Sequence, residues 1–377
     1  MKKINTGKFQ KVLGKYEAFF PANLPFKDIV LEDEIINLLV KAERDVGELK
    51  AIESILPNSN LLIQKYALKE ALLSSQIEGT RTTIAKVIEN KKDDMMDVRE
   101  VKNCMDALQY GIDKMTKKNF PLCLRLIKEI HGILMNNVRG GEPNKTPGEF
   151  RKSQNWIGGL SPAEAVFCPP TPEIMIESIS NLEKYLHEEN GLPDLIKCGL
   201  IHYQFETIHP FCDGNGRTGR MLIILYLIQK NILNSPILYL SLYFKQNRND
   251  YYHYLSTASK NGDINSWIKF FLRGIIAVAT QVIETTKAII KLQKTDIKKT
   301  ASINNGEAII EYLMRNPLIE TKDLQIHLKI SYNTTSTIVQ KLVSLKILEQ
   351  KSSGTRNKKY IYKKYLNILE RGCENFN

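Results

Sequence analysis

The sequence has little cysteine, and its cysteines are scattered. Six occur in 377 residues, at positions 104, 123, 168, 198, 212 and 373. None has the paired spacing that zinc sites and disulfide frameworks use. The distribution therefore excludes both and predicts reduced thiols in a cytoplasmic protein.

Long apolar runs are also absent. The longest, residues 221–228, is far shorter than the roughly 18 residues that a membrane span needs. The basic N-terminus is not followed by the apolar stretch of a secretory signal. Hydrophobic residues make up 43% and charged residues 25% of the chain, which is typical of a soluble globular protein. We expect two or three domains from this length and no membrane.

Positive charge is concentrated toward the C-terminus. The formal net charge is +12, and residues 287–377 hold 17 Lys or Arg against 8 Asp or Glu. A basic terminal region indicates an acidic partner, with nucleic acid first. The alternative is a solvated surface that only keeps the protein soluble, and composition alone slightly favours it.

Helical periodicity dominates the chain, so we predict an all-α fold. Breaks rich in Pro, Gly, Asn and Asp separate the helical segments. We divide the chain into an N-terminal helical region (1–115), a helical core (116–262), a long helix with a linker (263–300) and a C-terminal domain (301–377). The predicted helices of the first two regions cover residues 31–49, 60–78, 98–115, 121–135, 172–187 and 195–207.

Two regions depart from simple helices. Residues 155–168 contain two short extended pieces around a Gly/Ser/Pro turn, which predicts a small β-hairpin; the alternative is an irregular surface loop. In the C-terminal domain, three helices followed by two extended segments predict a winged helix-turn-helix. The helices cover 307–314, 321–328 and 331–345, and the extended segments cover 347–351 and 359–362.

The predicted winged helix could bind DNA or protein. Residues 332–337 of its third helix are small or polar and suit a major groove, while Arg356, Lys358 and Lys359 suit backbone phosphate. A winged helix that mediates protein contact or homodimerisation is an equal alternative.

The densest group of reactive side chains is in residues 209–220, His-Pro-Phe-Cys-Asp-Gly-Asn-Gly-Arg-Thr-Gly-Arg. Gly214 and Gly216 permit a tight turn that leads into a helix, where successive N–H groups form an anion site. Arg217 and Arg220 lie three residues apart on one helix face and can hold the same polyphosphate.

Two residues of this segment add chemistry to the anion site. Asp213 offers a hard oxygen ligand suited to Mg²⁺ that is bound mainly by phosphate and water. His209 has an ordinary pKa suited to proton abstraction near neutral pH. The combination predicts phosphoryl or nucleotidyl transfer. The alternative is a Gly-rich helix start with a core histidine and surface arginines.

This segment resembles the Fic-family motif His-x-Phe-x-Asp-Gly-Asn-Gly-Arg-x-x-Arg at every fixed position. The resemblance implies transfer of AMP from ATP to a Tyr, Ser or Thr hydroxyl of a target protein. His209 would be the base, Asp213 would hold Mg²⁺, and the Gly214, Asn215 and Gly216 region would cradle the phosphates. Arg217 would neutralise the β-phosphate, and Arg220 would bind the γ-phosphate. The related Doc kinases have Lys where this chain has Gly216, which argues for nucleotidyl transfer.

An upstream segment resembles the family's inhibitory motif, Ser/Thr-x-x-x-Glu-Gly/Asn. Ser74 and Glu78 are four residues apart on a predicted helix and so share one side. In the family this glutamate pairs with the second arginine, here Arg220, and occupies the γ-phosphate site. The alternative is a plain helix C-terminus capped by Gly79.

Three further assignments come from the same resemblance. The predicted hairpin over 155–168 corresponds to a flap that holds the target segment in extended form. Asn247 falls where relatives contact the nucleotide. Gln204 is a weaker nucleotide-binding candidate, for which helix packing is at least as good an explanation.

We thus predict a protein adenylyltransferase that uses ATP and Mg²⁺ and is inhibited by its own Glu78. One alternative is a DNA-binding regulator whose nucleotide site senses ATP or only modifies the protein itself. Another uses the same site to remove AMP, with Glu78 orienting a water.

Overall fold

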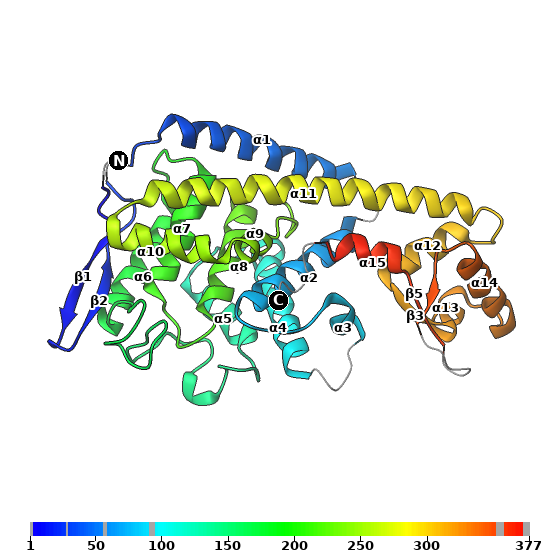
Figure 1. The fold of residues 1–377 in the computed structure, drawn as a ribbon, viewed down its shortest axis with the longest axis horizontal. Coiled ribbons are helices and arrows are strands. Elements are labelled where there is room, and N and C mark those ends of the chain that lie inside the picture. The colour runs from blue at the N-terminus through cyan, green and yellow to red at the C-terminus, as the bar shows by residue number, and fades with distance from the viewer. Residues whose placement is uncertain (1–2, 28, 56–58, 90–94, 352–357, 372–377) are drawn as a thin grey trace.

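Helices form most of the chain, as the apolar periodicity predicted (Figure 1). The computed structural model describes residues 3–27, 29–55, 59–89, 95–351 and 358–371. The helices of the first two regions are α1 (Asp33–Ile55), α2 (Ser59–Ile77), α3 (Ile84–Glu89), α4 (Met95–Lys118), α5 (Leu124–Leu134), α6 (Pro172–His187), α7 (Asp194–Ile208), α8 (Asn215–Gln229), α9 (Ser241–Gln246) and α10 (Arg248–Asn261).

The centre of the fold is the helix pair α7 and α8. Nearly every residue of both helices is buried, because other helices cover them on all sides. α6 and α11 pack on α7, while α2, α4 and α5 pack on α8. The turn between α7 and α8 carries the motif at 209–220, so two deeply buried helices position it.

The longest helix, α11 (Ile264–Lys299), runs along the whole molecule with α1 beside it (Figure 1). Trp267 is buried and its Nε1 donates to Gly199 O at 2.8 Å, which fixes α11 to α7. α11 is long and apolar enough to cross a membrane, but 61% of that apolar window is buried inside the protein. Burial of this kind is typical of a core helix.

An N-terminal hairpin was not predicted. Strands β1 (Gly7–Val12) and β2 (Tyr16–Pro21) pair antiparallel, and Phe19 N donates to Cys168 O at 2.8 Å. The hairpin therefore supports the base of segment 155–168. That segment is itself less regular than predicted: a single antiparallel bridge joins Ile157 to Phe167. The fold is otherwise the mostly helical one expected.

The helices predicted in the C-terminal region are present, together with a three-stranded sheet of order β3-β5-β4. Thr335 is buried, so it faces the core and not a binding surface. The tip expected to carry Arg356 lies outside the described residues. The elements are α12 (Gly306–Arg315), β3 (Leu318–Glu320), α13 (Thr321–Leu328), α14 (Tyr332–Ser344), β4 (Glu349–Gln350), β5 (Lys359–Ile361) and α15 (Lys363–Leu369).

The C-terminal region is fastened to α11. Tyr362 Oη donates to Oδ2 of the fully buried Asp296 at 2.7 Å, and α15 packs back along the long helix (Figure 1). The described part of this region is therefore an integral part of the molecule.

Candidate active site

The turn between α7 and α8 leaves several backbone N–H groups without a partner inside the helix. His209 ends α7 with a left-handed φ of 50°, and Gly214 precedes α8 with a φ of 74°. Thr218 N makes the first bond of α8, to Gly214 O at 3.0 Å. The N–H groups of residues 215–217 therefore remain available to an anion, at the positive end of the helix.

Asn215 holds this turn closed. Its side chain accepts from Phe211 N at 2.9 Å and donates to Phe211 O at 2.8 Å, and it is buried. The amide group is thus already engaged. Asn215 can therefore contact a phosphate only through its backbone N–H.

His209 is half-buried at the start of the turn. Its Nδ1 lies 3.3 Å from Glu206 O. A carbonyl oxygen only accepts hydrogen bonds, so Nδ1 carries the proton and Nε2 keeps a free lone pair. Burial lowers the pKa of His209 to about 4. The imidazole is therefore neutral at pH 7 and able to accept a proton through Nε2.

Arg217 is a buried cation with weak partners. Its Nη2 donates to Met135 Sδ at 3.4 Å, and its Nε has no hydrogen-bond partner in the described chain. An unsatisfied buried guanidinium N–H is costly. A phosphate at the adjacent N–H groups would satisfy it.

Asp213 lies on the open side of the turn, with its side chain 43% exposed. One carboxylate oxygen accepts from Gly214 N at 2.6 Å, and Lys145 Nζ lies 3.6 Å from the other. No group of three His, Cys, Asp or Glu residues that could hold a metal occurs in the described ranges. A single carboxylate beside an anion site nevertheless fits Mg²⁺ that arrives on a nucleotide, since phosphate and water then supply the other ligands.

Glu78 pairs with Arg220, as the family resemblance implied, and Ser74 contacts the same arginine. Glu78 Oε1 accepts from Arg220 Nη2 at 2.6 Å, and Ser74 Oγ accepts from Arg220 Nε at 2.9 Å. The Arg220 side chain is 1% exposed and the Glu78 side chain is 35% exposed. Burial would raise the pKa of Glu78, but the charge and hydrogen bond of Arg220 outweigh it and hold that pKa below its ordinary value.

Glu78 also closes over the start of α8. A Cβ added to Gly216 would lie 2.4 Å from Glu78 Oε1. The Glu78 carboxylate therefore fills the space beside Gly216, in the first turn of α8. A side chain at position 216, such as the lysine of Doc kinases, would not fit while Glu78 is in this place.

Sequence reasoning missed how His131 supports the turn. Its Nε2 donates to Asp213 O at 2.9 Å, its Nδ1 accepts from Gly148 N at 2.8 Å, and its ring stacks on Phe211 at 3.7 Å. Burial lowers the pKa of His131 to about 4. It is a neutral structural histidine, and no local sequence signal indicates its distant partners.

Two acids near Arg220, the buried Glu70 and the partly buried Glu206, were also missed. Burial raises the pKa of both Glu70 and Glu206 to about 7, and the charge of Arg220 acts in the opposite direction on each. Ser241 hydrogen-bonds the Glu70 carboxylate, whereas Glu206 Oε1 has no partner in the described chain. The position of Glu206, three residues before His209, is the only sequence signal for it.

The last two predicted site residues have different outcomes. Asn247 lies at the junction of α9 and α10, where its Nδ2 donates to Tyr243 O at 3.0 Å. Its neighbour Arg248 and the Glu78 side chain both line a cavity of about 380 Å³. Gln204 is fully buried and donates to Ala22 O at 2.9 Å, which favours the packing explanation over a nucleotide contact.

Comparison with protein families identifies two regions. Residues 121–227 match the Fic/DOC family, and residues 36–113 match the Fic/DOC family N-terminal region. The "Protein adenylyltransferase Fic" of Drosophila grimshawi is 32% identical over 168 residues, which are 44% of this chain and 31% of that protein. The protein of the same name from Culex quinquefasciatus is 31% identical over 166 residues, 44% of this chain and 30% of that protein. The chain thus spans about a third of the length of these curated relatives.

Solved structures share the fold. A Fic family protein from Desulfovibrio desulfuricans G20 has a TM-score of 0.58 at 18% identity, covering 89% of this chain and 97% of that one. Fic-1 (residues 134–508) from C. elegans has a TM-score of 0.54 at 20% identity, covering 67% of this chain and 74% of that one.

Proposed function

Because the chain carries a Fic/DOC domain with its N-terminal companion, we propose that it transfers AMP from ATP to a hydroxyl group of a target protein. The observation that carries the proposal is the composition of one turn. A proton acceptor, an exposed carboxylate and a buried arginine with an unsatisfied N–H surround the available amides of residues 215–217. This set matches what attack on a nucleoside triphosphate requires.

The chemistry follows from the positions of these groups. The phosphates bind the amides of residues 215–217 and the guanidinium of Arg217. Nε2 of His209 accepts the proton of the target hydroxyl while its oxygen bonds to the α-phosphorus. The bond from the α-phosphorus to the bridging oxygen breaks, and pyrophosphate leaves with the electron pair. Asp213 would hold Mg²⁺, which neutralises the charge that develops on the leaving group.

Glu78 keeps this enzyme inactive. It neutralises Arg220 at 2.6 Å and occupies the space above Gly216, so the γ-phosphate has neither its cation nor its place. ATP then binds poorly or with its α-phosphorus out of line.

Incubation of purified variants with labelled ATP tests the proposal. Glu78→Gly should increase AMP incorporation, and adding His209→Ala to that variant should abolish it. Glu78→Gln is the matched control, because it keeps the shape and removes the charge, and it should give an intermediate rate. Equal labelling of all variants would disprove these roles. Mass spectrometry of a lysate treated with Glu78→Gly and each nucleoside triphosphate would then identify the nucleotide and the target.

Segment 155–168 is the proposed target-holding flap. Its apolar side chains Trp156, Leu160 and Val166 are exposed, Leu160 at 90%. Among the described residues the only β-bridge within this segment joins Ile157 to Phe167, and Phe19 N bonds Cys168 O at the base of the segment. Exposed apolar side chains and unpaired backbone groups support a role in binding an extended target segment, including one from another copy of this chain.

A specific observation supports nucleic-acid binding as a second function. Lys287, Lys291, Lys294 and Lys298 are exposed, and their spacing of four, three and four residues places them on one face of α11. They lie on the half of α11 that leads into the C-terminal region, and Lys287 also pairs with Glu48 Oε1 at 3.4 Å. Lysines in such a row suit the phosphates of one DNA strand.

Salt-dependent DNA binding tests this second function. The double variant Lys291→Glu/Lys294→Glu should bind a 30-base-pair duplex more weakly and lower the slope of log K against log salt by about 2. Lys11→Glu/Lys15→Glu, in the N-terminal hairpin, is the matched control. No DNA binding, or an equal loss in both double variants, would rule the surface out.

A further inference from the structure

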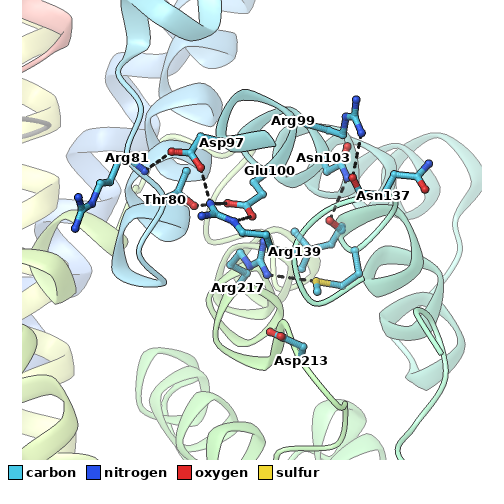
Figure 2. Close-up of polar contacts among 12 residues, drawn as sticks. Thr80, Arg81, Asp97, Arg99, Glu100, Asn103, Asn137, Arg139, Asp213 and Arg217 are labelled. Carbon is cyan, nitrogen blue, oxygen red and sulfur yellow. Dashed lines mark hydrogen bonds and ion pairs between the residues drawn. The ribbon is translucent and has the colours of Figure 1, made fainter. Parts of the chain in front are cut away.

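The chain directly after the inhibitory glutamate is tied to α4 (Figure 2). Thr80 Oγ1 donates to Glu100 Oε2 at 2.5 Å, and Arg81 N donates to Asp97 Oδ2 at 2.7 Å. α2 ends at Ile77, and one further turn follows in which Glu78 N and Thr80 N both bond Ser75 O at 3.1 Å. Residues at a helix end fray unless contacts outside the helix hold them. The bonds of Thr80 and Arg81 to α4 are such contacts.

The same two acids hold Arg139 from the other side (Figure 2). Arg139 Nε and Nη2 donate to the two oxygens of Glu100, both at 2.7 Å, and Nη2 also contacts Asp97 Oδ1 at 2.5 Å. The Glu100 side chain is 4% exposed. Burial would raise its pKa, but the hydrogen bonds of Arg139 and Thr80 keep the pKa below its ordinary value. Glu100 is therefore a buried carboxylate shared between two segments.

Arg139 and Gly140 belong to a segment that packs against the turn between α7 and α8. A Cβ added to Gly140 would lie 2.1 Å from Asp213 Oδ2, so this glycine packs directly against the proposed metal ligand. Met135, four residues before Arg139, contacts the guanidinium of Arg217 through its sulfur. Glu100 therefore bonds Thr80, which follows Glu78 in the chain, and Arg139, whose neighbour Gly140 packs against Asp213 beside the proposed phosphate site.

We propose that Glu100, through its bonds to Thr80 and Arg139, positions the inhibitory Glu78. These bonds hold the end of α2 in a fixed place relative to the segment at 139–140 that packs on the turn between α7 and α8. Glu78 reaches Arg220 because the chain two residues later is anchored to α4. Release of that anchor lets Glu78 leave Arg220. The consequence for catalysis depends on the proposed adenylyltransferase activity, whereas the anchoring itself does not.

Hydrogen exchange tests the anchoring without reference to activity. Thr80→Val removes the hydroxyl without changing the size of the side chain, and Glu100→Gln removes the charge. Both should speed amide exchange over residues 74–82 about fivefold or more, as loss of a hydrogen bond to a charged group implies. Arg99→Ala is the matched control: Arg99 bonds Asn137 O at 3.2 Å from the same helix but does not contact Thr80. Unchanged exchange in both test variants would overturn the proposal.

Activity measurements separate positioning from a merely structural role. Thr80→Val should raise AMP incorporation about fivefold in the otherwise native chain and should have no such effect on Glu78→Gly, because no inhibitory group remains to be released. A similar gain in both backgrounds would overturn the proposed route through Glu78. Absence of activity in Glu78→Gly would instead reject the proposed function and leave the exchange result to decide the anchoring.

Discussion

Replacing Glu78 by Gln should destabilise the free protein and make its stability depend strongly on ATP. Arg220 is 1% exposed, and Glu78 is its carboxylate partner at 2.6 Å. Removing one partner of a buried ion pair costs about 3–5 kcal/mol. Because Glu78 is itself 35% exposed, water screens part of this interaction, and we expect about 2 kcal/mol. The phosphates of ATP would then supply the missing negative charge.

Thermal denaturation with and without Mg·ATP measures both effects. Without nucleotide, Glu78→Gln should melt about 2–4 °C below the native protein. ATP at about 100 times its Kd should add about 2.7 kcal/mol to the variant. The native protein should gain much less, because ATP must first displace Glu78. Equal stability of the two proteins, together with an equal gain from ATP, would refute the idea that carboxylate and phosphate compete for one arginine.

Three further predictions follow from single contacts. Burial lowers the pKa of His209 to about 4, so the rate of Glu78→Gly should be constant from pH 8 to about pH 5 and fall below that as the imidazole takes up a proton; a titration near pH 6.5 would contradict this. His131→Ala should lower AMP incorporation about tenfold in that same active variant, since about 1–3 kcal/mol of support for the turn is lost, and a full rate would show that the turn is held without it. Tyr362→Phe should cost about 1–3 kcal/mol in urea denaturation, because buried Asp296 loses a hydrogen bond, and an unchanged midpoint would contradict the fastening of the C-terminal region.

The fold was predictable where structure is local. The helices follow from periodicity, and the chemistry of residues 209–220 follows from one contiguous segment. The ion pair of Glu78 with Arg220 joins residues 142 positions apart, and it was expected only from a family resemblance. Charge and spacing within one sequence do not indicate such a partner.

Long-range contacts explain what sequence reasoning missed. The N-terminal hairpin gains support from Cys168, far along the chain, and its strands are too short to give a clear alternating pattern. The family resemblance made Gln204 a weak candidate for a nucleotide contact, yet its partner is the carbonyl of Ala22, 182 residues away. A polar residue on a buried helix is ambiguous until its partner is known.

The partly buried acid Glu206 adds a pH dependence to the effect of replacing Glu78. Burial raises the pKa of Glu206 to about 7; the charge of Arg220 lowers it, and the charge of Glu78 raises it further. In Glu78→Gln that last effect disappears, so the pKa of Glu206 falls and its carboxylate ionises at a lower pH than in the native protein. Because the pKa of Glu206 is higher in the folded state than in the unfolded state, the free energy of unfolding decreases as the pH rises from the unfolded pKa to the folded pKa. The variant has a lower folded pKa and therefore loses less stability over this range. The stability deficit of Glu78→Gln relative to the native protein should therefore shrink between pH 6 and pH 8 in urea denaturation. The same comparison made in a Glu206→Gln background should give a deficit that does not change with pH; if the deficit still shrinks there, another group supplies the compensating charge.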